Sequence, residues 1–191
     1  MTGALDEYEY GKALQRVESF FWDFCDNYLE LVKSRRYGDH GPAAAASANT
    51  ALLTALSALL RVFALYLPFA AEEVWSWWQP GSIHTSKWPV PEELFGPAGG
   101  EDDRGARTLE LAASVLGEIR KKKSEEQRPL KTAVAKAIVR LPDADRELLG
   151  GCESDLRASG LIQELVVESA PALDVIVTLA PPDAAAQESR A

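Results

Sequence analysis

The sequence predicts a mainly helical protein: a bundle of about four helices followed by a small α+β subdomain with the order β-α-β-β. Apolar residues recur every three or four positions up to Ile119, as on one face of a helix. After Pro129 the period changes to the alternation typical of strands. With 47% hydrophobic and 26% charged residues, the chain has a globular composition and can bury roughly 70% of its unfolded surface.

The first helix is expected from about Leu5 to Arg36, and the turn at Gly41-Pro42 follows it. Basic residues in its last turn suit the negative end of the helix dipole. Cys25 lies beside its apolar stripe and is expected as a small core residue. The stripe itself runs at alternating spacings of three and four: Leu14, Val17, Phe21, Phe24, Tyr28 and Leu31.

The second helix is expected over 43–67, and its apolar composition predicts that nearly all of it is interior. Pro68 cannot continue the hydrogen-bond ladder, so a shorter helix restarts there and stops at the Gln79-Pro80-Gly81 turn. Of the tryptophans on this helix, Trp77 is expected to be exposed, because the others share the opposite face. The proline-rich stretch 82–91 is expected as an extended strap across the bundle.

The glycine-rich, acidic stretch 96–105 is expected as an exposed loop, which divides the chain into domains 1–103 and 104–191. The second domain begins with a helix that ends in the basic run Arg120–Lys123. A strand, a helix closed by Gly160 and two further strands follow, in an order across the sheet that the sequence leaves open. The tail from about 181 is expected to be frayed.

Enzyme motifs such as a Walker loop, HExxH or GxSxG are absent from the sequence. Cys25, Cys152, His40 and His84 do not stand at metal-ligand spacings, so neither a metal site nor a disulfide framework is predicted. The N-terminus lacks the features of a signal peptide, and polar residues and Pro68 interrupt the longest apolar stretch. We therefore expect a cytoplasmic protein without a membrane partner.

Charge is unevenly distributed along the chain. The formal net charge is −9, yet the stretch from Ile119 to Arg140 carries +6, so the remainder carries −15. Such polarity favours a local surface for a structured anion such as folded nucleic acid, while the acids elsewhere oppose indiscriminate binding. On charge alone, a solvated basic helix end is an equally weighted alternative.

Three segments, in this order, carry a family resemblance: FFWDFCDNYLELVKSRRYGD, LRVFALYLPFAAEEVWSWW and SIHTSKWP. They resemble the anticodon-binding domain of class I aminoacyl-tRNA synthetases, and the aromatic-rich first segment is most similar to the valyl enzymes. The segment IRKKKSEEQRPL resembles the linker into the small C-terminal α/β part of the valyl and isoleucyl enzymes. The resemblance implies a helical bundle that binds the anticodon stem-loop of tRNA, with valine tRNA the first expectation.

The resemblance also implies a C-terminal part, or a free-standing relative, of a ligase that joins valine to its tRNA in protein biosynthesis. Motifs resembling HIGH and KMSKS are absent, so ATP and valine are expected to bind a catalytic domain outside this sequence. The chain alone is then inactive, and the remainder of the synthetase is a partner. The alternative function is a free-standing helical module for protein interaction, which predicts an exposed apolar patch.

We hypothesise that two basic groups form one phosphate-binding surface, and that an aromatic side chain stacks on a base. The stacking candidates are Tyr37 and Trp77. The phosphate-binding candidates are Lys33, Arg35, Arg36, Arg120, Lys121, Lys122, Lys123, Arg128 and Lys131.

Overall fold

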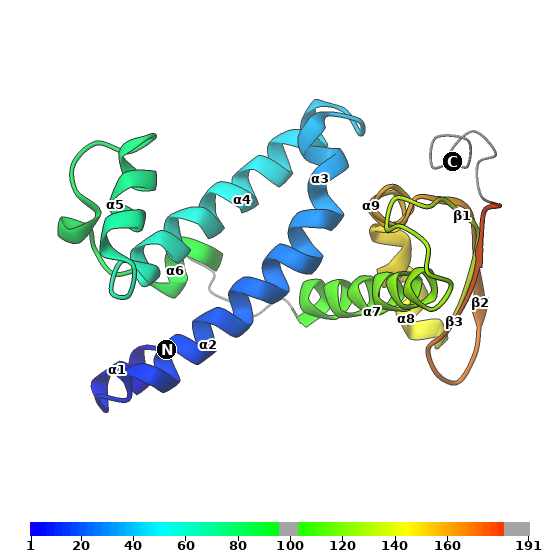
Figure 1. Cartoon of the computed structure of the whole chain (residues 1–191), viewed down its shortest axis with the longest axis horizontal. Helices are drawn as coiled ribbons and strands as arrows, with labels where there is room; N and C mark the ends of the chain where they lie inside the picture. The colour runs from blue at the N-terminus through cyan, green and yellow to red at the C-terminus, as the bar shows by residue number, and fades with distance from the viewer. Residues whose placement is uncertain (96–102, 182–191) are drawn as a thin grey trace, which may run out of the picture. The chain divides into compact units, whose positions relative to one another are not determined.

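The computed structural model describes residues 1–95 and 103–181 and divides the chain into two compact units (Figure 1). Unit 1 comprises Met1–Leu29 and Arg35–Glu101, and unit 2 comprises Glu30–Ser34 and Asp102–Ala191. The combination of a helical unit with a small mixed sheet confirms the predicted fold class. The tail expected beyond 181 lies outside the described residues, as does most of the loop expected at 96–105.

The long N-terminal helix predicted from Leu5 is interrupted. Tyr8 adopts a left-handed backbone conformation with φ 60°, which no α-helix accommodates, so the main helix starts only at Tyr10. It then continues through a π-helical segment rather than as one regular helix. The observed segments are α1 (Thr2–Asp6), α2 (Tyr10–Asp23), the π-helical segment Phe24–Leu29 and α3 (Glu30–Tyr37).

The helix restart predicted at Pro68 is confirmed, whereas Pro42, expected in the turn before the second helix, is the first residue of that helix. Helix α4 (Pro42–Phe63) and helix α5 (Pro68–Ser76) each carry proline in the first turn, where its missing N–H costs no hydrogen bond. The prediction that α4 is nearly all interior is wrong, because Ala48 is its one buried residue. By length and composition α4 could cross a membrane, a test that core helices of soluble proteins also pass.

The strap expected over 82–91 is only partly extended. Residues Ile83–Thr85 form a 3₁₀ turn, and α6 (Pro91–Phe95) begins where the strap was expected to end. The Glu72 carboxylate on α5 accepts hydrogen bonds from Ser82 Oγ at 3.0 Å and from the Ile83 amide at 2.9 Å. These bonds hold the turn against α5, where Ile83 joins a small core with Trp75.

Unit 2 contains a three-stranded sheet in the order β2-β1-β3, with β1 parallel to β2 and antiparallel to β3. The single helix expected before Gly160 is two helices, because the chain leaves helical geometry at Cys152 (φ −121°, ψ 12°). The strands and helices follow the predicted order: α7 (Asp103–Glu125), β1 (Val134–Leu141), α8 (Asp143–Gly151), α9 (Glu153–Gly160), β2 (Ile162–Ser169) and β3 (Asp174–Leu179).

Helices α7, α8 and α9 cover one face of this sheet and form the main core with it (Figure 1). Cys152 belongs to this core, as predicted, whereas Cys25 is only half-buried. The largest fully buried side chains come from α7, β1, α8 and α9: Leu116, Ile119, Leu141, Leu149, Leu156, Val115, Val134 and Val139.

The opposite face of the sheet carries cross-strand ion pairs on either side of the apolar side chains Ile138, Val166 and Ile176. Lys136 on β1 pairs with Glu164 on β2 at 2.6 Å. Arg140 lies between Glu168 on β2 at 2.9 Å and Asp174 on β3 at 3.5 Å. Opposite charges on neighbouring strands favour this strand register.

Candidate nucleic-acid interface

The basic run Arg120–Lys123 of α7 follows directly on the buried stripe of this helix. The helix periodicity determines which of these lysine and arginine side chains reach solvent. Lys121 is exposed and pairs with Glu118 at 3.2 Å, while Lys122 pairs with Glu126 at 3.1 Å. Arg120 is half-buried. Exposed ion pairs of this kind contribute about 0–1 kcal/mol and are screened by salt, so the two lysines can exchange their carboxylates for phosphates.

Lys123 does not belong to a surface, which corrects its place among the predicted phosphate-binding residues. It follows Ile119 by four positions, on the inner side of α7, and only 3% of the residue is exposed. Its Nζ donates to the carbonyl of Leu130 at 2.9 Å and to that of Gly160 at 3.3 Å. Burial lowers the pKa of its ammonium, and the nearby charge of Arg120 lowers it further.

The turn after α7 carries two more basic residues, Arg128 and Lys131. Gln127 adopts a left-handed conformation (φ 51°), and the Arg128 amide then donates to the Lys123 carbonyl at 2.7 Å, which closes the helix end. Arg128 is half-buried, and its Nη2 donates to the Ala180 carbonyl at 3.3 Å. Lys131 is exposed. The turn therefore holds Arg128 in place and presents Lys131 to solvent.

The second predicted basic group lies at the end of α3. Lys33 pairs with Glu30 at 3.0 Å, Arg35 is half-buried and Arg36 is exposed. The C-terminal end of a helix carries partial negative charge, which suits these cations. Lys33 falls in unit 2, whereas Arg35 and Arg36 fall in unit 1. That this group and the bases near the end of α7 form one surface stays a prediction.

Exposed aromatic side chains complete the candidate interface in unit 1. Tyr37, which directly follows the basic residues Arg35 and Arg36 of α3, is 75% exposed. Trp77 is 70% exposed, as predicted, and its Nε1 donates to Glu73 at 3.1 Å. Trp75 and Trp78 pack edge to face instead, with ring centroids 5.3 Å apart. A rigid, exposed indole can stack on an unpaired base.

Sequence reasoning missed Phe69, which is 89% exposed at the start of α5. It precedes Glu73 by four positions and Trp77 by eight, so the three side chains follow one side of the helix. This spacing was visible in the sequence once Pro68 was recognised as the helix start. The side of α5 that carries Phe69 and Trp77 is called the α5 aromatic face below.

Within the described ranges 1–95 and 103–181, no group of three or more His, Cys, Asp or Glu side chains could hold a metal ion.

Lys136 and Arg140 contribute to the positive charge of the stretch from Ile119 to Arg140, but both side chains face acids on the sheet. The hydrogen bond to Glu168 raises the pKa of Arg140 above its ordinary value. Within residues 119–140, the basic side chains that reach solvent without facing acids on the sheet are thus near the end of α7 and in the turn that follows it.

Comparison with known proteins yields one family and a consistent set of relatives. The family described as the anticodon-binding domain of tRNA ligase matches residues 1–139. Valine–tRNA ligase of Thermobifida fusca is 45% identical over 182 residues, covering 94% of this chain and 20% of the relative. The enzymes of that name from Salinispora tropica and Bifidobacterium longum are 41% and 36% identical, over 86% and 92% of this chain. The chain spans about a fifth of the length of these relatives.

Proposed function

The chain belongs to the anticodon-binding domain family of tRNA ligases, and from this premise we propose that it binds the anticodon stem-loop of valine tRNA. The family match over residues 1–139 is the observation that carries the proposal. The relatives named valine–tRNA ligase supply the amino acid and the enzyme context. In that context the chain acts as the C-terminal domain of a cytoplasmic ligase, and valine and ATP bind elsewhere in the enzyme.

The chemistry of the exposed side chains supports the proposal. Lys121, Lys122 and Lys131 reach solvent in unit 2 and are suited to phosphate oxygens. Tyr37 and the α5 aromatic face in unit 1 are suited to unpaired bases, which an anticodon loop presents. The acidic remainder of the chain weakens contact with RNA at other positions, which favours one defined mode of binding.

A binding titration against valine tRNA and isoleucine tRNA transcripts at two salt concentrations tests the proposal. We expect tighter binding of the valine transcript and a log-log salt slope of about 0.7 to 0.9 for each phosphate contact. Equal binding of both transcripts would contradict anticodon recognition by this chain. Absence of binding would contradict the proposal as a whole.

Charge reversal then locates the surface. The double variant Lys121→Glu, Lys122→Glu should weaken binding of both transcripts and reduce the salt slope, because it removes two cations that face outward. Arg146→Glu on α8 is the control for a single reversal, since Arg146 is exposed, belongs to the same unit and makes only a surface pair with Asp143. It changes the charge by −2 where the double variant changes it by −4, so half the loss of the double variant would show a general charge effect and contradict this location. Lys123 is left unchanged in this test because its ammonium is buried.

A further inference from the structure

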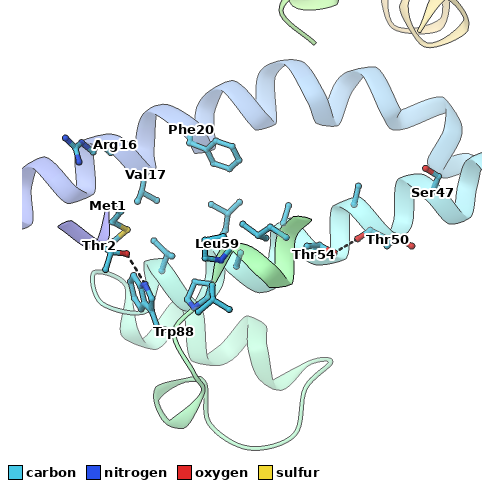
Figure 2. Close-up of a pocket in the computed structure, with 18 residues that line it drawn as sticks. Met1, Thr2, Arg16, Val17, Phe20, Ser47, Thr50, Thr54, Leu59 and Trp88 are labelled. Carbon is cyan, nitrogen blue, oxygen red and sulfur yellow. Dashed lines mark hydrogen bonds between the residues drawn. The ribbon is translucent and has the colours of Figure 1, made fainter. Parts of the chain in front are cut away.

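An apolar groove of about 900 Å³ lies within unit 1, between α2, α4 and the segment 88–94 (Figure 2). Val17 and Phe20 of α2 line one side, and Leu59 of α4 and Trp88 line the other. Half of the Phe20 residue is open to solvent, at 56% exposed. The groove explains why α4, although apolar, is so little buried: its neighbours within the unit leave this side of the helix open.

The floor of the groove is made of small α4 residues at helical spacing. Thr50 and Thr54 turn their hydroxyls to carbonyls of their own helix, at 3.0 and 2.8 Å, so that these polar groups are already satisfied. Ala51, Ala55 and Ala58 add only methyl groups. Small side chains allow the backbone of a second helix to approach within the 8–10 Å typical of packed helices.

The dimensions and the chemistry of the groove select the kind of occupant. Its lining residues on α4 extend from Ser47 to Val62, a rise of about 22 Å at 1.5 Å per residue, which is the length of a four-turn helix. Among the lining residues that the structure describes, Arg16 has the one formally charged side chain. A polyanion such as RNA finds too few partners there, whereas an amphipathic helix finds an apolar surface with one cation at its edge.

We propose that the groove binds an amphipathic helix from the remainder of the ligase, whose apolar stripe lies on the α4 floor. This inference rests on the proposed function, because it takes the occupant from the enzyme context. The relatives are long enough to contain such a helix outside the matched region, since this chain matches only about a fifth of each. An acidic side chain near one end of the occupying helix would complement Arg16.

The experiment compares the isolated chain with a chimera. In the full-length Thermobifida fusca ligase, this chain replaces the segment that it matches. Both proteins are labelled with a photoreactive diazirine, without RNA, and the modification of Phe20, Leu59 and Trp88 is measured by mass spectrometry. We expect labelling of these residues in the isolated chain and its loss in the chimera, because the helix covers them.

A pair of variants in α4 identifies the groove as the cause. Ala55→Glu places a charge on the floor, and we expect it to restore labelling of Phe20 and Leu59 in the chimera. Ala46→Glu makes the same change on the same helix at an exposed residue outside the lining and should leave the protection intact. Circular dichroism of the isolated variants should match that of the parent chain, because the groove is open there.

Equal labelling in the isolated chain and the chimera would overturn the inference, as would equal effects of the two glutamate variants. Light scattering of the isolated chain separates the competing occupant: a dimer with protected groove residues would assign the groove to a second copy and also overturn it. The labelling contains no RNA, so protection without tRNA binding would contradict the proposed function alone. Binding of valine tRNA without protection would contradict the groove assignment alone.

Discussion

The buried ammonium of Lys123 allows a quantitative prediction for Lys123→Met. Methionine keeps most of the apolar stem, so the packing change alone should cost under about 1.5 kcal/mol. The substitution removes the donor to the Gly160 carbonyl, which is buried, and to the Leu130 carbonyl, which is partly buried. An unsatisfied buried carbonyl costs about 1–3 kcal/mol, and relief from burying a charge offsets part of it. We expect unit 2 to lose about 2–4 kcal/mol of its free energy of unfolding.

Urea denaturation measures this loss, and the tryptophans separate the units. All five tryptophans, Trp22, Trp75, Trp77, Trp78 and Trp88, belong to unit 1, so their fluorescence reports unit 1 while circular dichroism reports both units. At a slope of about 2 kcal/mol per molar urea, the middle of the usual range, the unit 2 transition should move down by about 1–2 M. Lys121→Met, at an exposed surface pair, is the control and should change stability by under about 1 kcal/mol.

The pH dependence adds a second condition. Because burial lowers the pKa of Lys123 in the folded chain, the unfolded chain binds more protons between that pKa and the ordinary one. The free energy of unfolding of the parent therefore rises with pH across this alkaline window, and Lys123→Met lacks this contribution. Equal stability of parent and variant, or an equal loss for Lys121→Met, would refute the conclusion that Lys123 stabilises unit 2 through its hydrogen bonds to the Leu130 and Gly160 carbonyls.

Three further predictions concern stability. Gly160→Ala should cost about 1–3 kcal/mol in urea denaturation, because the added methyl would lie 2.8 Å from Ile162 Cγ1 and 3.1 Å from Ile119 Cδ1. Gly150→Ala on α8 meets no atom within 4 Å and should stabilise by about 0.5–1 kcal/mol, so a loss of stability there would contradict the argument. In unit 1, the hydrogen bond from Arg61 lowers the pKa of Glu93, so the ion pair stabilises the unit at neutral pH and is lost as pH falls through that lowered pKa. The Tm difference between parent and Glu93→Gln, followed by tryptophan fluorescence, should be largest near neutral pH and vanish in acid; a difference that grows in acid would refute it.

Local patterns predicted the helices and strands well, because each pattern depends on residues close in the chain. The restart at Pro68 follows from a missing N–H, and the three strands follow from alternation after Pro129. The order β2-β1-β3 depends on pairing between distant segments, which no local pattern contains. The break at Tyr8 also escaped prediction, because a single non-glycine residue takes the left-handed conformation without a Gly or Pro beside it.

In the candidate site, too, some features follow from the local sequence and others do not. Composition located the basic run of α7, but the helical phase after Ile119 places Lys123 inside and Lys121 outside. Applying the buried stripe of the helix to its last turn could have found this. The prediction that α4 is buried was wrong for another reason. Apolar composition indicates which residues favour an interior, but it does not indicate whether a neighbouring element covers them.

The central strand of the sheet is also the first to be synthesised. Strand β1 needs β2 and β3 on its two sides, and both follow it in the chain, so β1 leaves the ribosome before either partner exists. The family match ends at residue 139, inside β1. A fragment cut at that point would make this early state permanent, with both strand edges unpaired and the apolar side of α7 uncovered, and should aggregate. Fragments prepared for RNA binding should therefore extend through Leu179, where the last strand closes the sheet.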